Sequence, residues 1–197
     1  MTLWWLIYEY GHAPYRPLWV PPAPLYFVPL LVLPCAFVLL VGAFVLPSPT
    51  SLDGEKFLAS SHATRGVLRV TRHPFLWCAV LWAGAHLLVN ADAGSLIFFG
   101  GLGLTALHGS FDIDRKRRRT HPAEFARFEA ETSNVPLVAV LAGRNRLVLR
   151  ELWLPLLLGL ALALGAIALH PRLFSGASAV PSLLHDRFPS TTTQVGG

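Results

Sequence analysis

Long apolar runs are the feature that most constrains this chain, because each is about as long as a helix that crosses a lipid bilayer. The clearest is 25–46, LYFVPLLVLPCAFVLLVGAFVL, which meets the roughly 20 residues needed to cross a hydrocarbon core of about 30 Å. Two further runs, 74–90 and 94–111, are joined by a short turn and predict a membrane helical hairpin. The run 152–170 predicts a fourth span. Two small residues in this span would let neighbouring helices approach closely: Gly159 and Gly165.

The composition agrees with a chain whose solvent is lipid. Hydrophobic residues make up 53% of the sequence, charged residues make up 14%, and the mean hydropathy is +0.51, which together exclude an ordinary soluble enzyme. The predicted fold class is all-α, a polytopic transmembrane helix bundle over 1–176 followed by a disordered, Ser-, Thr-, Gly- and Pro-rich tail over 177–197. We also expect a partial helix over 1–8, which is too short to span, and an interfacial segment over 135–142.

Lysine and arginine predict the orientation, because cytoplasmic loops carry an excess of positive charge near the ends of membrane spans. Thirteen of the sixteen basic residues lie in 47–73 and 112–151, and the hairpin turn has none. We therefore place both segments in the cytoplasm. The net charge is +5, and the basic residues lie beside hydrophobic spans. This position indicates anionic lipid headgroups as partners and argues against nucleic acid.

Histidines at membrane depth are the first candidates for chemistry, because ionisable groups are costly there. Of the eight histidines, His86 and His108 lie within predicted spans. At ~1.5 Å per residue they lie roughly 9 Å and 24 Å from the hairpin turn, too far apart to ligate one metal. His73 is close to His108 in depth and could pair with it, whereas His86 needs a partner near the other face, such as His170. The simpler alternative is that each histidine hydrogen-bonds a backbone carbonyl.

The TRHP motif is more specific than any single histidine. Pro74 suits the first turn of a helix, so Arg72 and His73 would stand at the membrane entrance and could hold an anionic group. The basic run 115–119 is interpreted as a topology and headgroup anchor. The signatures of soluble nucleotide-binding, zinc and serine-nucleophile enzymes are absent from the sequence. Our candidate cofactor-binding residues are therefore His86, His108, His73 and Arg72, with His86 as the metal ligand.

Several blocks of the sequence resemble the NnrU family, bacterial membrane proteins linked by name and context to nitrite and nitric oxide metabolism. The segment 65–101, RGVLRVTRHPFLWCAVLWAGAHLLVNADAGSLIFFGG, resembles the core of that family. TSNVPLVAVLAGR at 132–144, HPRLFSG at 170–176 and GHAPYRPLW at 11–19 resemble other parts of it. The resemblance covers about 1–176 and implies an integral protein of the bacterial inner membrane.

A distant branch of the same family includes 15-cis-zeta-carotene isomerase of plants and cyanobacteria, a membrane haem b protein with histidine ligation. By this resemblance, the AxxAH stretch ending at His86 carries a haem ligand, and the expected cofactor is haem b. Family members generally begin with a further helix and a half that includes a histidine, so the second ligand stays open and haem binding is expected to be weaker without that segment. The resemblance implies a redox, isomerase, or nitrite- or nitric oxide-linked role on a hydrophobic small molecule or nitric oxide.

Two other classes of function stay open at this stage. Membrane methyltransferases also carry an RHP motif at a helix start, followed by a glycine-rich hairpin, although the segment AEFARFEAETSNVP lacks the paired glutamates expected of them. A non-catalytic assembly factor for a respiratory or nitric oxide reductase complex would be the third class, with another membrane protein as its partner. Whether the chain is an enzyme is not decided by the sequence.

Overall fold

The computed structural model describes residues 2–51, 53–60 and 63–173, and the regular secondary structure within these ranges is helical apart from one β-bridge between Pro17 and Asp92. The tail predicted at 177–197 lies outside the described residues. The elements in chain order are α1 Thr2–His12, η1 Ala23–Phe27, α2 Val28–Val45, η2 Gly54–Phe57, η3 Gly66–Arg69, α3 Pro74–Val89, α4 Ala93–Thr120, α5 Pro122–Glu131, α6 Val138–Leu141 and α7 Leu149–Leu173.

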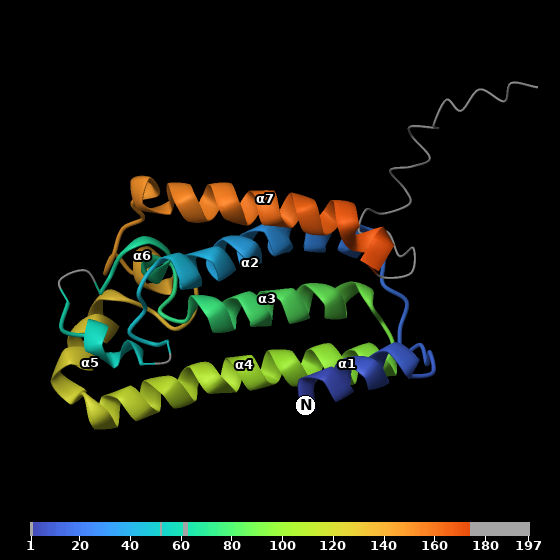
Figure 1. The fold of residues 1–197 in the computed structure, drawn as a ribbon, viewed down its shortest axis with the longest axis horizontal. Coiled ribbons are helices and arrows are strands. Elements are labelled where there is room, and N and C mark those ends of the chain that lie inside the picture. Colours follow the sequence, from blue (N-terminus) through green and yellow to red (C-terminus); the bar gives the residue numbers. More distant parts are fainter. Residues whose placement is uncertain (1, 52, 61–62, 174–197) are drawn as a thin grey trace, which may run out of the picture.

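The four long helices lie side by side in the order α7, α2, α3, α4 (Figure 1). Helix α1 lies against one half of α4, while α5 and α6 lie at the opposite end of the bundle (Figure 1). Helix α3 is apolar but shorter than the other three long helices. Within the described residues, three helical segments are long and apolar enough to cross a membrane: Ala23–Val45, Ala93–Thr120 and Leu149–Arg172. The prediction of a helical membrane bundle is confirmed.

The predicted hairpin is also present, but its second helix is longer than its apolar run. Helix α3 begins at Pro74 and α4 begins at Ala93, after a turn in which Asp92 accepts a hydrogen bond from the backbone of Ser95 (3.0 Å). Helix α4 continues nine residues beyond the predicted end at 111. The continuation is stable because protein, not lipid, covers one of its sides. Its buried polar residues recur at helical spacing: Ser110, Asp114 and Arg117.

Close helix packing explains one of the two glycines singled out in the last span. A Cβ atom on Gly159 would lie 2.7 Å from the Cα atom of Val38, so α7 and α2 touch backbone to backbone at this point. The prediction is confirmed for Gly159. It is wrong for Gly165, where a Cβ atom would meet nothing within 4 Å.

Two ion pairs fasten the loops at the basic end of the bundle. Arg69 donates to Glu151 at the start of α7 (2.8 Å), and Glu151 also accepts the backbone N–H of Gly66 (2.7 Å). Buried Arg117 pairs with Glu55 in η2, and this hydrogen bond holds the pKa of the Glu55 carboxyl below its usual value. Both predicted cytoplasmic segments are therefore gathered at one end of the molecule.

Candidate functional site

The TRHP and TSNVP blocks, which are about 60 residues apart in the sequence, dock onto each other through their backbones. The N–H of Arg72 donates to the carbonyl of Ser133 (2.9 Å), and the N–H of Leu137 donates to the carbonyl of Val70 (2.7 Å). The hydroxyl of Thr71 adds a side-chain bond to the carbonyl of residue 134 (2.5 Å). The two blocks therefore form one structural unit at the start of α3.

A single buried carboxylate joins this unit to α4. Asp114, 1% exposed, accepts Nε and Nη2 of Arg72 (2.9 and 2.6 Å), Nε2–H of His73 (2.8 Å) and Nδ2–H of Asn134 (3.2 Å). A buried charge needs this degree of pairing, because an unpaired ion in a low-dielectric interior is strongly destabilising. We call Arg72, His73, Asp114 and Asn134 the Asp114 cluster.

Further contacts satisfy the remaining polar groups around the cluster. The Oδ1 atom of Asn134 accepts the indole N–H of Trp77 and the hydroxyl of Ser110, both at 3.1 Å. Arg72 also donates to Glu129 of α5 (3.1 Å), and its guanidinium lies 5.9 Å from the ring centroid of Phe125. The cluster thus connects α3, α4, α5 and the loop after α5.

The anionic group that Arg72 and His73 hold in this structure is the chain's own Asp114, which sequence reasoning missed. Asp114 stands just before five consecutive basic residues, where an acid is usually a surface ion-pair partner. The signal that could have found it is its helical phase with Ser110 and Arg117, which indicates a polar but protein-covered side of α4.

The structure gives His73 and His108 different partners. His73 is buried against Asp114, whereas the side chain of His108 is 75% exposed and pairs with Asp112 on the next turn of α4 (2.9 Å). In place of the expected pairing with each other, His73 pairs with buried Asp114 and His108 pairs with peripheral Asp112.

His86 lies near the other end of α3, in an aromatic environment. Its ring stacks on Phe99 of α4 with centroids 4.7 Å apart and an interplanar angle of 21°, and Trp82 lies one turn earlier with its ring centroid 4.8 Å away. The Nδ1 atom is 2.8 Å from the backbone carbonyl of Trp82. A carbonyl can only accept, so Nδ1 carries the proton and, in the neutral ring, Nε2 keeps its in-plane lone pair.

Two phenylalanines and a tyrosine complete this environment, which we call the His86 site: His86, Trp82, Phe99, Phe98 and Tyr10. Tyr10 of α1 stacks on Phe98 at 4.6 Å and meets Phe99 edge-on at 5.5 Å. Its hydroxyl is 3.0 Å from the Oγ atom of Ser95, which in turn donates to Asp92 (2.6 Å). The apolar character of these helices in the sequence did not indicate which aromatic side chains would be in contact.

Comparison with known proteins places this arrangement in a family. The chain matches the NnrU family, described as NnrU protein, over residues 1–178. It belongs to the NnrU family. No solved structure gives a significant match to the chain. The family assignment therefore rests on sequence.

Two curated relatives carry the same descriptive name. The chain is 36% identical over 123 residues to "15-cis-zeta-carotene isomerase, chloroplastic" of Arabidopsis thaliana, which covers 57% of this chain and 32% of that protein. It is 29% identical over 120 residues to the protein of that name in Zea mays, covering 59% and 33%. This NnrU-family chain thus spans about a third of the length of these relatives.

His86 has the hydrogen-bonding arrangement that a histidine ligand of haem needs. Among the described residues, no group of three or more His, Cys, Asp or Glu side chains could hold a metal ion. Haem needs only one or two protein ligands, because the porphyrin supplies four nitrogens. His86 meets the usual requirement, since ligating histidines donate their other ring N–H to a carbonyl or carboxylate. His170 lies near the C-terminal end of α7, which is at the same end of the bundle as the C-terminal end of α3 (Figure 1).

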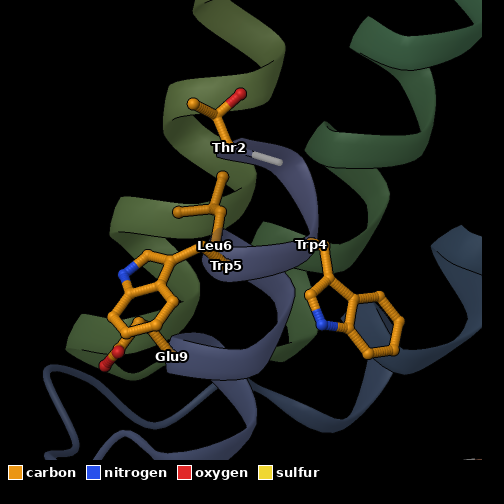
Figure 2. A pocket seen from close by; sticks show the side chains of 5 residues that line it. All are labelled: Thr2, Trp4, Trp5, Leu6 and Glu9. Carbon is orange, nitrogen blue, oxygen red and sulfur yellow. The ribbon is translucent and has the colours of Figure 1, made fainter.

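An open apolar pocket of about 1130 Å³ lies at the surface of α1. It is lined by Thr2, Trp4, Trp5, Leu6 and Glu9, and Figure 2 shows the two indole rings projecting to different sides of the helix. Leu6 also packs against the cluster that contains Phe98 and Phe99. Leu6 therefore connects this pocket to the aromatic residues of the His86 site.

Truncating Tyr10 to Ala is expected to loosen α1. The change removes the ring stack on Phe98 and the hydrogen bond to Ser95, so we expect about tenfold faster amide exchange over Thr2–His12, equivalent to ~1.4 kcal/mol. Hydrogen–deuterium exchange followed by mass spectrometry measures this. Tyr8→Ala is the matched control, because the ring contacts of exposed Tyr8 in the described residues are with Trp5 and His12 of its own helix. Equal exchange in the two variants would contradict the role of Tyr10.

Proposed function

We propose that this NnrU-family protein binds haem b in the membrane with His86 as an iron ligand, and that it transforms a hydrophobic small molecule by isomerisation or redox chemistry. The observation that carries the proposal is the His86 imidazole, whose Nδ1–H is engaged by Trp82 and whose Nε2 lone pair is left in the ring plane. When bound, haem b would supply a redox-active iron that can bind substrate or nitric oxide.

The residues around His86 would act by orientation and by excluding water. The carbonyl of Trp82 fixes the tautomer and direction of the ring, which is how outer partners tune a metal-binding histidine. The stacked ring of Phe99 covers a face of the imidazole and does not block its in-plane nitrogen. His170 is our candidate for the second ligand. An apolar surrounding of this kind also favours a neutral imidazole ligand.

The relatives support an apolar substrate. Both are named for isomerisation of a carotene, a hydrocarbon that is soluble only in lipid. A molecule of that kind would approach the His86 site from the bilayer, past the exposed apolar side chains of α1. The chain spans about a third of the length of those relatives, so their activity is attributed to it only as part of this proposal. A nitrite- or nitric oxide-linked role would use the same iron position.

We place the protein in the bacterial inner membrane with 47–73 and 112–151 in the cytoplasm. These segments carry thirteen of the sixteen basic residues and lie at the same end of the bundle. The Asp114 cluster lies at this end and the His86 site at the other, so the haem would lie toward the outer face.

The membrane methyltransferase alternative has less support from the geometry. Such an enzyme would use its RHP residues to hold a ligand, whereas here Arg72 and His73 are buried and paired with Asp114. We therefore treat methyl-donor binding, and assembly of a respiratory or nitric oxide reductase complex, as outcomes to be tested.

A visible spectrum of the detergent-purified protein tests the haem proposal. We expect the reduced-minus-oxidised spectrum of the wild type, with haem supplied during expression, to show a Soret band and α-band typical of haem b. His86→Ala is expected to abolish both bands, because it removes the ligand. His108→Ala is the matched control, since His108 is exposed and pairs only with Asp112, and it should keep the spectrum.

Each contrary result points to a different alternative. Absence of haem from the wild type, or its full retention in His86→Ala, would overturn the proposal. Saturable binding of S-adenosylmethionine without haem would favour the methyltransferase. Neither ligand, together with co-purification of a respiratory complex, would favour the assembly factor.

A further inference from the structure

The segment 135–150 presents an apolar stripe that nothing in the described chain covers. Val135, Val138 and Leu141 follow each other at three-residue spacing and are 45%, 43% and 83% exposed, whereas Ala139 on the inner side is fully buried. The short helix α6 is therefore two-sided. This stripe is too short to span a bilayer, but it suits a position in the interface.

Positive charge accompanies the stripe. The segment 135–150 contains three arginines and no acidic residue. Arg144 turns inward and donates to three carbonyls at the end of α5, those of Glu129, Ala130 and Thr132 (2.8–3.1 Å). Arg146 and Arg150 are exposed, and they flank exposed Leu147 and Leu149. A surface of this composition is complementary to negatively charged headgroups above acyl chains.

The fold holds the segment at the membrane boundary. Leu137 has a φ of +66°, a backbone conformation that leucine rarely adopts, and its N–H is held by the carbonyl of Val70 just before α3. The other end of the segment leads directly into the apolar helix α7 at Leu149. Both attachments are starts of bundle helices, so the segment lies level with the membrane surface.

We propose that 135–150 is a binding surface for anionic phospholipid. The stripe of Val135, Val138 and Leu141 enters the acyl boundary, and Arg146 and Arg150 contact headgroup phosphates. Because the occupant is the bilayer itself, this surface functions independently of haem binding at His86. The segment is clasped to the block that carries Arg72 and His73, so lipid binding also fixes the position of the Asp114 cluster.

Depth-dependent fluorescence quenching tests this surface. Leu141→Cys, placed in a Cys35→Ala/Cys78→Ala background, is labelled with bimane and reconstituted into phosphatidylcholine nanodiscs with and without phosphatidylglycerol, each containing lipid with a shallow nitroxide. We expect quenching to be about twofold stronger with phosphatidylglycerol. Arg146→Gln/Arg150→Gln should remove the increase. Arg16→Gln/Arg172→Gln, which neutralises two exposed arginines outside the basic segments 47–73 and 112–151, should keep it.

Other results overturn the proposal. Quenching by aqueous iodide and not by nitroxide lipid in both bilayers would mean that the stripe faces water. An equal loss of quenching in the two arginine variants would mean that charge acts without regard to position. Quenching that appears only when a disc holds two copies of the chain would assign the surface to self-association. A far-ultraviolet circular dichroism spectrum identical to that of the parent is required of each variant.

Discussion

Asp114→Asn is expected to lower the free energy of unfolding by about 3–5 kcal/mol, because it leaves the buried guanidinium of Arg72 without its main counter-ion. The amide is nearly the same size as the carboxylate, so the loss reports charge and hydrogen bonding and not a cavity. Glu129 at 3.1 Å offers Arg72 a second, more exposed partner and sets the lower end of the range. Unfolding in mixed detergent micelles, followed by circular dichroism, measures the effect.

Asp112→Asn is the control for this prediction. Asp112 lies two residues earlier on the same helix, is 43% exposed and pairs with exposed His108 and Arg115, so its loss should cost within about 0.5 kcal/mol. Arg72→Met/Asp114→Leu should recover part of the stability lost in Asp114→Asn, because it leaves neither charge unpaired. Similar losses for the two single asparagine variants would show that the Asp114 cluster contributes no more than a surface pair.

The sequence predicted the helices of this protein well because lipid imposes a strict compositional rule on what crosses it. The runs at 25–46, 74–90 and 152–170 each became a helix close to its expected bounds. The rule failed at 94–111, where the apolar run ends but α4 continues, since protein contacts replace lipid around Asp114. The end of an apolar run therefore marks the expected membrane boundary and not the end of the helix.

The sequence predicted several residues of the candidate sites but not the residues that they contact. Arg72 and His73 are marked by their place before Pro74, yet their common partner lies about 40 residues later on another helix. His86 is marked as a lone histidine in an apolar span. Its stacking on Phe99 depends on how α3 and α4 are rotated against each other. The hydrophobic periodicity of the sequence does not specify this rotation. Contacts between helices are thus the part that required the structure.

The two sites lie at opposite ends of the bundle and involve different helix contacts. The Asp114 cluster joins α3, α4 and α5 at the basic end, where the helices and their loops would otherwise be free to shift. The His86 site uses the other ends of α3 and α4, where their relative rotation determines how Phe99 meets the imidazole. The two sites therefore use opposite ends of the same pair of helices, α3 and α4.

Gly159→Ala is expected to have the second largest effect on stability, at about 1–3 kcal/mol, because the added methyl group overpacks a contact between backbones. Its Cβ atom would lie 2.7 Å from Cα and 2.8 Å from N of Val38, and backbone atoms cannot rotate away as a side chain can. Helix α7 must therefore move away from α2. Thermal unfolding in detergent and cysteine cross-linking between α2 and α7 measure the two consequences.

Gly165→Ala provides a control on the same helix with the same chemical change. A Cβ atom there meets nothing within 4 Å, and alanine has a higher helix propensity than glycine by up to about 1 kcal/mol, so this variant should be as stable as the wild type or more so. The sign of the difference between the two variants is the informative quantity, since helix propensity favours alanine at both positions. If Gly159→Ala also stabilised the protein, α2 and α7 would not be in backbone contact, and the order of helices in the bundle would need to be revised.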